Sequence, residues 1–243
     1  MSILSIKVDY VAALRELKRL KEPDPAQMAV LAEVAGADGI SCHLREDRRH
    51  IRDRDLYLLK EMVKTKLTLQ MAPTDDLIER AVEVKPWMAT LMPFTSENLL
   101  VNNGVDLDAN RDLYAETAAT LKASGINICY FIDPEIDAVK EAARAKVDAI
   151  ELNAYKYTSA ETIEAAEDEL DKLEKMAQLA TKLNLMVDCG NGLNYKNIRP
   201  LVDLGLFEEF TVGYAVVCRA TLVGIDRAVR ELGNIVHITV EKP

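Results

Sequence analysis

A basic stretch of the chain, HLREDRRH at residues 43–50, has the side-chain types that bind a phosphate ester. It contains His43, Arg45 and His50, and it follows an apolar run that is typical of a buried strand. The planar guanidinium of arginine contacts a phosphate through two hydrogen bonds, and histidine exchanges protons near neutral pH. Most charged runs, however, are solvated loops whose arginines pair with neighbouring carboxylates. The charge pattern alone leaves both interpretations open.

Two other apolar runs end in ionisable side chains. Lys7 and Asp9 lie two residues apart at the end of the first run, so both point to one side of the predicted strand. Glu151 and Asn153 have the same spacing in a later run, and we expect both in the substrate site. Because a buried lysine is unfavourable unless it is paired or functional, we expect Lys7 to form an ion pair with Asp9 or Glu151, or to act as an imine-forming nucleophile. Glu151 is in turn an ion-pair partner or a general acid and base.

Two glycine-containing turns follow the last two apolar runs. They are GNGL, with Asn191 and Gly192, and VGYA, with Gly213 and Tyr214. The backbone N–H groups of such turns bind phosphate in barrels of alternating strands and helices. A glycine often serves only the turn, so each turn alone is weak evidence. The two together favour an anion site.

Eight short runs rich in apolar residues alternate with longer segments of helical periodicity, of which we also count eight. Most of the runs are nearly continuous in apolar residues, as expected for parallel strands that are buried on both faces. The runs lie at residues 3–9, 38–44, 67–71, 88–93, 126–132, 147–152, 184–189 and 209–214.

The helical segments have recognisable starts. Asp24 is a predicted N-cap with Pro25 at the first helical position, and Thr158 and Glu161 predict a capping box that opens the longest helix. No linker rich in Pro, Gly or Ser divides the segments. Eight β/α units in 243 residues predict a single (β/α)₈ TIM-barrel domain over residues 1–243, and a doubly wound open sheet is the alternative. A barrel would bring the strand-end residues above to one face.

The composition limits the class of partner and the compartment. The chain carries 30 Lys and Arg against 40 Asp and Glu, a net charge of −10, so we expect neither nucleic acid nor an anionic membrane as a partner. Cys42, Cys129, Cys189 and Cys218 match no metal-binding pattern, which predicts reduced core cysteines and no metal site. The N-terminus lacks signal-peptide features, and no apolar run approaches the ~18 residues of a membrane span. We expect a cytoplasmic protein.

The sequence resembles the pyridoxine 5′-phosphate synthase family of vitamin B6 biosynthesis. The resemblance rests on HLREDRRHIRDRD, the preceding AGADGI, PDP before a helical segment, FID after the fifth run and G-x-GL after the seventh, and it is nearly colinear along the chain. It implies a (β/α)₈ barrel with extra helices that assembles as a homo-oligomer, an octamer built from dimers. It also implies the condensation of 1-deoxy-D-xylulose 5-phosphate with 3-amino-2-oxopropyl phosphate, without a metal or an organic cofactor.

The resemblance implies roles for the positions that match the family. His43 matches a catalytic histidine, and Glu151 matches a carboxylate that assists the transition state. Asp9 matches a substrate contact. The residues that match phosphate contacts are Arg45 and His50 for the xylulose phosphate, and Gly192 and Gly213 for the second phosphate.

At other positions the chain departs from the family. Gln70 stands in place of a general-base glutamate, and Asn191 in place of a histidine. Because neither amide exchanges protons near neutral pH, each loss should cost roughly 10²–10⁴-fold in rate unless another group compensates. The remaining departures are Lys7 for an asparagine, Tyr10 and Tyr214 for histidines, Lys18 for an arginine that contacts the amino ketone, Leu100 for a substrate-contacting threonine, and LNAYKY for IHTG after Glu151. We expect the substrate or its phosphate to be bound also by the substituted residues Tyr10, Lys18, Gln70, Asn191 and Tyr214.

Three hypotheses for the function follow. The first is a family enzyme that acts on phosphorylated keto substrates by carbonyl condensation or cyclisation, with Lys7, His43 and Glu151 as catalytic residues, and that has diverged from pyridoxine 5′-phosphate synthesis. The second is an authentic synthase with a rearranged set of acid and base groups. The third is a non-catalytic protein that binds a phosphorylated metabolite.

Overall fold

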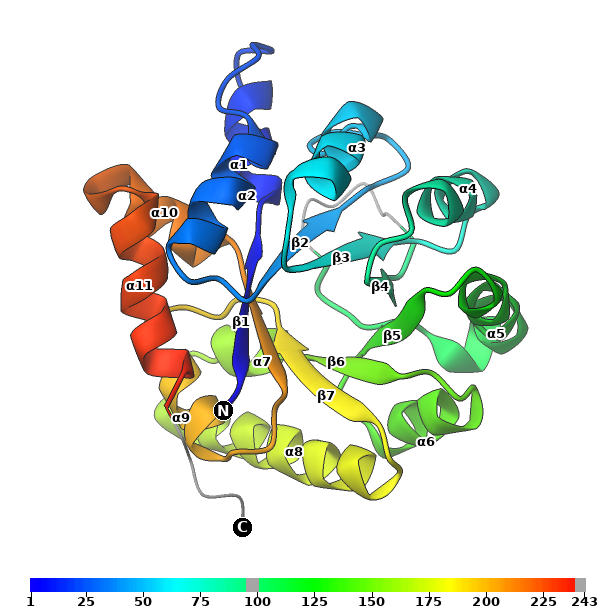
Figure 1. Ribbon diagram of the computed structural model, residues 1–243. Helices are drawn as coiled ribbons and strands as arrows, with labels where there is room; N and C mark the ends of the chain where they lie inside the picture. The colour runs from blue at the N-terminus through cyan, green and yellow to red at the C-terminus, as the bar shows by residue number, and fades with distance from the viewer. Residues whose placement is uncertain (95–100, 239–243) are drawn as a thin grey trace.

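The computed structural model describes residues 1–94 and 101–238, and eight parallel strands form a closed barrel at its centre. In Figure 1 the strands surround a common axis and the helices cover them from outside. The strands are β1 (Ile3–Lys7), β2 (Gly39–His43), β3 (Lys66–Met71), β4 (Met88–Leu91), β5 (Asn127–Ile132), β6 (Ala149–Asn153), β7 (Met186–Gly190) and β8 (Glu209–Val212). The pairing of β8 with β1 closes the barrel. The TIM-barrel prediction is confirmed, and the open-sheet alternative is wrong.

Eleven helices lie within the described residues, three more than the eight helical segments counted in the sequence. They are α1 (Asp9–Glu16), α2 (Pro25–Val34), α3 (Asp53–Met62), α4 (Asp75–Val84), α5 (Leu107–Ala123), α6 (Ile136–Arg144), α7 (Tyr155–Thr158), α8 (Ile163–Lys182), α9 (Ile198–Asp203), α10 (Tyr214–Val223) and α11 (Ile225–Val236). Two connections between strands contain two helices each, namely α1 with α2 and α7 with α8, and two helices, α10 and α11, follow β8.

One predicted helix start is confirmed and one is wrong. Asp24 caps α2 through a 2.9 Å hydrogen bond from the backbone N–H of Ala26. The longest helix, α8, does not begin at Thr158, because Thr162 is its N-cap and accepts from the N–H of Ala165. Thr158 instead ends the single-turn helix α7. The hydroxyl of the buried Tyr157 in α7 donates to the backbone carbonyl of Asn197, which is 40 positions away in the sequence. The local sequence around Thr158 does not indicate this contact.

The two faces of the barrel strands differ in polarity. Leu4 and Ile6 of β1 pack in the apolar layer of the core. The carboxyl groups of Glu151, Asp188 and Glu209 are buried on adjacent strands, and register pairs Glu151 with Asp188 and Asp188 with Glu209. Burial and neighbouring carboxylates raise the pKa of Glu209 to about 7 and that of Asp188 well above its usual range. The barrel interior therefore contains a row of three buried carboxyl groups whose pKa values are raised.

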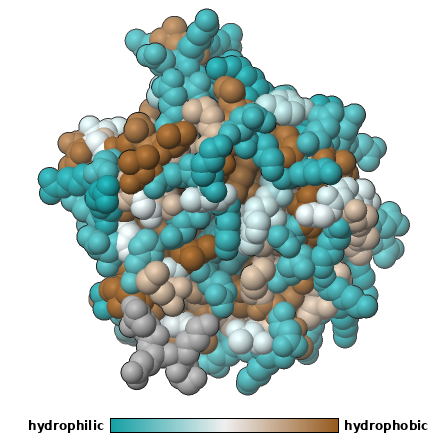
Figure 2. Space-filling model, in the orientation of Figure 1, coloured by the Kyte–Doolittle hydropathy of each residue, from teal (hydrophilic) through white to brown (hydrophobic). Residues whose placement is uncertain are grey.

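The burial of the cysteines agrees in part with the prediction that they lie in the core. All four thiols are free, and Cys42, Cys129 and Cys189 are buried while Cys218 is exposed. Figure 2 shows a mostly hydrophilic surface with a hydrophobic area in the upper left, near α2 and α10. The exposed apolar side chains on α1 and α2 include Leu14, Leu31 and Val34. No helix in the described part of the chain has the length and apolar character needed to cross a bilayer.

Candidate functional site

A cavity of about 610 Å³ opens at the carboxyl ends of the barrel strands. This is the face on which TIM-barrel enzymes carry their active sites. The predicted site residues that line it are Lys7, Asp9, Tyr10, His43, Arg45, His50, Gln70, Glu151, Asn191, Gly192, Gly213 and Tyr214. Side chains from both halves of the chain therefore converge on one space, as predicted from their positions at strand ends.

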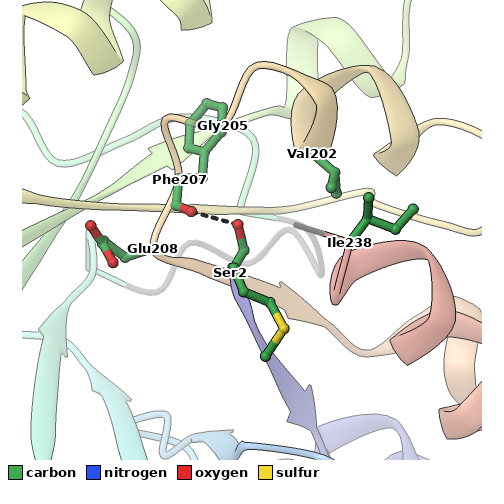
Figure 3. A pocket seen from close by; sticks show the side chains of 7 residues that line it. Ser2, Val202, Gly205, Phe207, Glu208 and Ile238 are labelled. Carbon is green, nitrogen blue, oxygen red and sulfur yellow. Dashed lines mark hydrogen bonds between the residues drawn. The ribbon is translucent and has the colours of Figure 1, made fainter. Parts of the chain in front are cut away.

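A second cavity lies at the other end of the barrel, where Ser2 precedes β1 and Phe207 precedes β8 (Figure 3). The hydroxyl of Ser2 donates to the carbonyl of Phe207 over 2.7 Å. The cavity has a volume of about 40 Å³, so it holds little more than one water molecule, which takes about 30 Å³ in the liquid. A phosphorylated substrate fits only the larger cavity.

Lys7, Gln70 and Glu151 form a hydrogen-bonded chain across the larger cavity. The amine of Lys7 donates to Oε1 of Gln70, and Nε2 of Gln70 donates to Oε2 of Glu151 over 3.0 Å. Lys7 forms no ion pair within the described residues, so the expected direct pair with Asp9 or Glu151 is absent. The amide of Gln70 separates the lysine from the glutamate and fixes the orientation of both.

The carboxyl group of Glu151 is deeply buried, with 4% of the residue exposed. Burial raises its pKa, while Lys7 and the hydrogen bond from Gln70 oppose that rise. Gly190, at the end of β7, makes room for this side chain, because a Cβ at position 190 would lie 2.1 Å from Oε1 of Glu151. Such a carboxyl group can exchange a proton with a ligand nearer neutral pH than an exposed glutamate can.

Asp9 and His43 lie together at the ends of β1 and β2. Oδ1 of Asp9 accepts the backbone N–H of His43 over 2.8 Å. Burial, with help from the positive charges of Lys7 and Arg45, lowers the pKa of His43 well below its usual range. Within the described residues, Oδ2 of Asp9 and Nε2 of His43 are buried and have no hydrogen-bond partner. Burial therefore favours the neutral imidazole of His43, and both atoms can bind a ligand.

The basic residues of the loop from β2 to α3 fall into two groups, one that lines the cavity and one that forms ion pairs. Arg45 and His50 line the cavity, and Nε of Arg45 has no partner among the described residues. Arg48 and Arg49 instead form ion pairs with Asp53 and Asp47. The basic stretch thus contains both the solvated ion pairs and the cavity-facing side chains that the sequence left as alternatives.

The two glycine turns line another part of the cavity. Gly192 has a φ of +78°, and a Cβ there would lie 2.1 Å from the hydroxyl of Thr158. Gly213 is the N-cap residue of α10. A helix N-terminus together with a close glycine turn can bind an anion through backbone N–H groups.

Two tyrosines stand next to each other on the cavity wall beside Gly213. The ring centroids of Tyr10 and Tyr214 are 5.3 Å apart in an edge-to-face arrangement. Tyr214 is 65% exposed, so it lies at the mouth, whereas burial raises the pKa of Tyr10. Both rings offer an apolar surface and a hydroxyl group to a ligand.

Asn191 and Asn153 form a second hydrogen-bonded group beside the cavity. The amide nitrogen of Asn191 donates to the carbonyl of Val101 over 2.8 Å and to Oδ1 of Asn153 over 3.0 Å. Asn153 donates to Asp133 and to the carbonyl of Asn102, and it does not line the cavity. This group connects β6 and β7 to the segment that leads into α5.

One other predicted contact lies away from the cavity. Lys18 is exposed beyond the end of α1 and does not line the cavity. Leu100 lies outside the described residues. Tyr155 and Thr158 line the cavity from the single-turn helix α7, although the sequence pattern did not identify either as a site residue. The change from IHTG to LNAYKY after Glu151 was the available signal for this wall.

The site combines groups that can bind anions with groups that can exchange protons. Arg45, His50 and the two glycine turns supply the first kind, and His43 and Glu151 supply the second. Lys7 adds a primary amine close to Glu151 through Gln70. Across the described residues, no three side chains of His, Cys, Asp or Glu are grouped as a metal site would require. The arrangement is suited to the chemistry of a phosphorylated carbonyl compound.

Known proteins resemble this chain over nearly its whole length. Residues 4–238 match the family model described as pyridoxal phosphate biosynthesis protein PdxJ. The pyridoxine 5′-phosphate synthase of Geotalea daltonii is 43% identical over 236 residues, which cover 97% of this chain and 99% of that protein. The synthase of Gloeothece citriformis is 42% identical over 232 residues, which cover 96% of this chain and 97% of that protein.

Solved structures with a similar fold are more distant in sequence. KGPDC from Streptococcus mutans has a TM-score of 0.66 and 11% identity, with 97% of both chains covered. Phosphoribosyl anthranilate isomerase from Thermus thermophilus has a TM-score of 0.60 and 15% identity, covering 95% of this chain and 96% of that one. These two likenesses concern the fold. The family model and the curated relatives, which extend from β1 through α11, show that the chain belongs to the pyridoxine 5′-phosphate synthase family, the enzymes of vitamin B6 biosynthesis.

Proposed function

We propose that the protein is an enzyme that binds phosphorylated keto substrates and carries out carbonyl condensation or cyclisation, and that its chemistry has diverged from authentic pyridoxine 5′-phosphate synthesis. The observation that carries this proposal is the chain Lys7–Gln70–Glu151. It contains a neutral amide at the position where the family resemblance implies a general-base glutamate. It also contains an amine where the resemblance implies an asparagine.

The proposed substrate carries its phosphate against Arg45 and His50. The free Nε of Arg45 supports this assignment, because a buried guanidinium nitrogen without a partner favours an anionic ligand. A second anionic group would bind at the turns of Gly192 and Gly213. The cavity volume of about 610 Å³ lies within the range of about 300–1,000 Å³ that is common for small-molecule sites.

The proposed chemistry begins at the substrate carbonyl. In one form, the amine of Lys7 attacks the carbonyl carbon, the resulting carbinolamine loses water, and an imine remains on the lysine. Glu151 delivers the proton that lets the hydroxyl group depart, and His43 exchanges protons elsewhere on the ligand. In the other form, Lys7 stays a fixed positive charge that holds a carboxylate or phosphate of the ligand. In that case the nucleophile comes from the substrate.

An authentic pyridoxine 5′-phosphate synthase with a rearranged proton-transfer set is the second candidate. Identity of 43% along nearly the whole length to a curated synthase favours it. In this candidate Glu151 and His43 would replace the acid and base groups that are absent at Gln70 and Asn191. In either case we propose that the protein works in the cytoplasm as a homo-oligomer.

Complementation of a vitamin B6 auxotroph tests the two candidates. The gene is expressed in a strain that lacks its own pyridoxine 5′-phosphate synthase, with a curated relative as the positive control. Under the leading proposal, growth without added pyridoxine fails although the protein is folded and abundant. Growth equal to that of the control would reject divergence and establish the second candidate. The purified protein is then assayed with phosphorylated ketones, and a lack of turnover together with tight phosphate binding would point to a binding protein.

A further inference from the structure

We infer that Arg15, which does not line the cavity, is a positioning residue whose ion pair with Asp55 holds the loop that presents Arg45 and His50 to the substrate phosphate. The inference rests on the phosphate-binding role proposed above for these two side chains. It adds a residue that neither the sequence pattern nor the cavity lining identifies.

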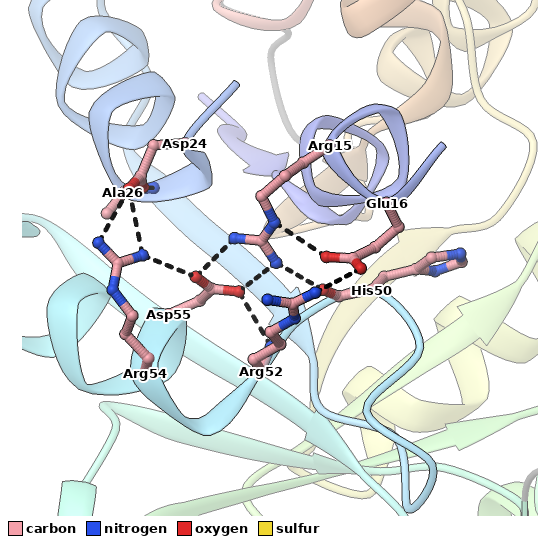
Figure 4. Close-up of polar contacts among 8 residues, drawn as sticks. All are labelled: Arg15, Glu16, Asp24, Ala26, His50, Arg52, Arg54 and Asp55. Atoms are coloured by element: carbon pink, nitrogen blue, oxygen red, sulfur yellow. Dashed lines mark hydrogen bonds and ion pairs between the residues drawn. The ribbon is translucent and has the colours of Figure 1, made fainter. Parts of the chain in front are cut away.

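Arg15 lies on α1, and 2% of the residue is exposed. Its guanidinium forms a two-point pair with Asp55, in which Nη1 and Nη2 each donate over 2.7 Å (Figure 4). Nη2 also donates to the backbone carbonyl of His50 over 2.9 Å, and Nε donates to Glu16 over 3.0 Å. A buried guanidinium with this many partners has one orientation, because any rotation would break several charged hydrogen bonds.

Asp55 extends the same contact to the start of α3. Its side chain is fully buried, and Oδ2 accepts the backbone N–H of Arg52 over 3.0 Å as well as the bond from Arg15. Arg52 is the N-cap residue of α3. The Arg15–Asp55 pair therefore joins three parts of the chain, namely α1, the end of the β2–α3 loop and the first turn of α3.

His50 is the point where this contact reaches the cavity. Its imidazole lines the cavity, while its carbonyl accepts the bond from Arg15 on the opposite side of the backbone. Because this carbonyl is bonded to the Cα that carries the imidazole, the bond from Arg15 restricts the backbone torsions of His50 and so the direction in which its side chain leaves the backbone. The position of His50 thus depends on a guanidinium that never touches the ligand.

Arg48 secures the other end of the loop in a similar way. Its Nη1 donates to the carbonyl of Arg45 over 3.1 Å and to that of Glu46 over 3.2 Å. Arg48 is held in turn by ion pairs with Asp53 and Asp76. Two arginines outside the cavity lining therefore hold the backbone of the two residues that are proposed to bind phosphate.

The substitution Arg15→Lys separates positioning from general stability. Lysine keeps the charge opposite Asp55, but it cannot hold both carboxylate oxygens and the carbonyl of His50 in a fixed plane. The control is Arg219→Lys, because Arg219 forms a two-point pair with Glu231 over 2.8 and 3.1 Å and does not line the cavity. Thermal unfolding and circular dichroism establish that each variant is folded.

Binding of inorganic phosphate is then measured by calorimetry for the wild type, Arg15→Lys, Arg219→Lys and Arg45→Ala. We expect Arg15→Lys to raise the dissociation constant about tenfold, as one lost charged hydrogen bond would, and Arg219→Lys to leave it unchanged. With a phosphorylated substrate that turns over, KM should rise more than kcat falls, because the phosphate is bound in the ground state and in the transition state alike.

The outcomes distinguish this inference from the proposed function. If Arg45→Ala weakens phosphate binding but Arg15→Lys does not, the inference is overturned and the phosphate site stands. A lower melting temperature for Arg15→Lys with wild-type affinity also overturns the inference, since the pair would then be only structural. If Arg45→Ala has no effect on phosphate binding, both are overturned. Should Arg15→Lys fail to fold, Asp55→Glu displaces the same guanidinium while keeping the charges, and the same criteria apply.

Discussion

The side-chain amide of Gln70 donates a hydrogen bond to the carboxyl group of Glu151 over 3.0 Å, and both residues are buried. The oxygen of the same amide accepts from Lys7. An amide in this orientation fixes the two ionisable groups on either side of it but does not exchange protons itself. Acid and base chemistry in the cavity must therefore come from groups other than residue 70.

The double variant Gln70→Glu with Asn191→His should not acquire full pyridoxine 5′-phosphate synthase activity. A carboxylate at position 70 would meet Lys7 and Glu151, so the new charge would pair with the lysine instead of remaining a free base. Catalytic residues that act as a unit are strongly non-additive. The measurement is growth of the auxotroph. Full rescue by this variant but not by the wild type would mean that the two substitutions alone account for the divergence.

A lysine that forms an imine can be trapped. Treatment with borohydride in the presence of a phosphorylated ketone should reduce the imine and leave a stable adduct on Lys7, which peptide mass spectrometry locates. Lys7→Arg is the control, because it keeps the charge and has no nucleophilic amine. If a ketone binds and turns over but no adduct appears, Lys7 is a fixed charge and the nucleophile belongs to the substrate.

Arg45→Ala should weaken the binding of phosphorylated ligands by about 10–100-fold, the cost of losing one or two charged hydrogen bonds. Arg49→Ala is the matched control, because Arg49 lies in the same loop but pairs with Asp47 outside the cavity lining. Competition with inorganic phosphate measures both. Equal affinities for the two variants would contradict the assignment of Arg45 to the substrate phosphate.

The stability of the fold should depend on the ionisation of Glu209. Its pKa is raised from 4.5 to about 7, so the unfolded chain releases this proton at a lower pH than the folded barrel. Stability is therefore lost as the pH rises from about 4.5 to about 7, and the loss persists above that range. Glu209→Gln should raise the free energy of unfolding at pH 8 by on the order of 1–3 kcal/mol and change it little at pH 4. Denaturant unfolding at the two values measures this difference.

The control for that prediction is Glu116→Gln, which neutralises an exposed glutamate on α5. It should change the unfolding free energy by less than about 0.5 kcal/mol at either pH, as is usual for surface substitutions. If Glu209→Gln destabilises the barrel at pH 8, its carboxylate makes a favourable interaction that outweighs the cost of its burial.

The strands could be predicted because their local sequence is nearly sufficient. Continuous apolar runs identify strands that are buried on both faces, and the order of eight such runs leaves few folds. The convergence of Lys7, His43 and Glu151 then follows from the carboxyl ends of the strands. The partner of Lys7 did not follow, because the choice between Gln70 and a carboxylate depends on side-chain geometry across the barrel.

The connections between strands and helices were less predictable, because their structure depends on contacts between residues that are far apart in the sequence. Thr158 begins a pattern typical of a capping box, but the packing of α7 beneath the Gly192 turn moves the helix start to Thr162. Asn153 has the spacing of a site residue, yet its amide group is occupied by Asp133 and neighbouring backbone. Arg15 has no distinguishing local pattern at all. Besides the adjacent Glu16, its partners His50 and Asp55 are 35 and 40 positions away in the sequence.

Because Gly190 has no side chain and lies against Glu151, the residue types that positions 190 and 151 can hold depend on each other. The oxygen of Glu151 occupies the volume that the methyl group of alanine would need, so no other residue at position 190 is compatible with the present rotamer of Glu151. Gly190→Ala should displace the carboxyl group of Glu151 from its present contact with Gln70, and it should be better tolerated in a barrel that has lost the long carboxyl side chain. A larger residue at position 190 therefore requires either another rotamer of Glu151 or a shorter side chain at position 151.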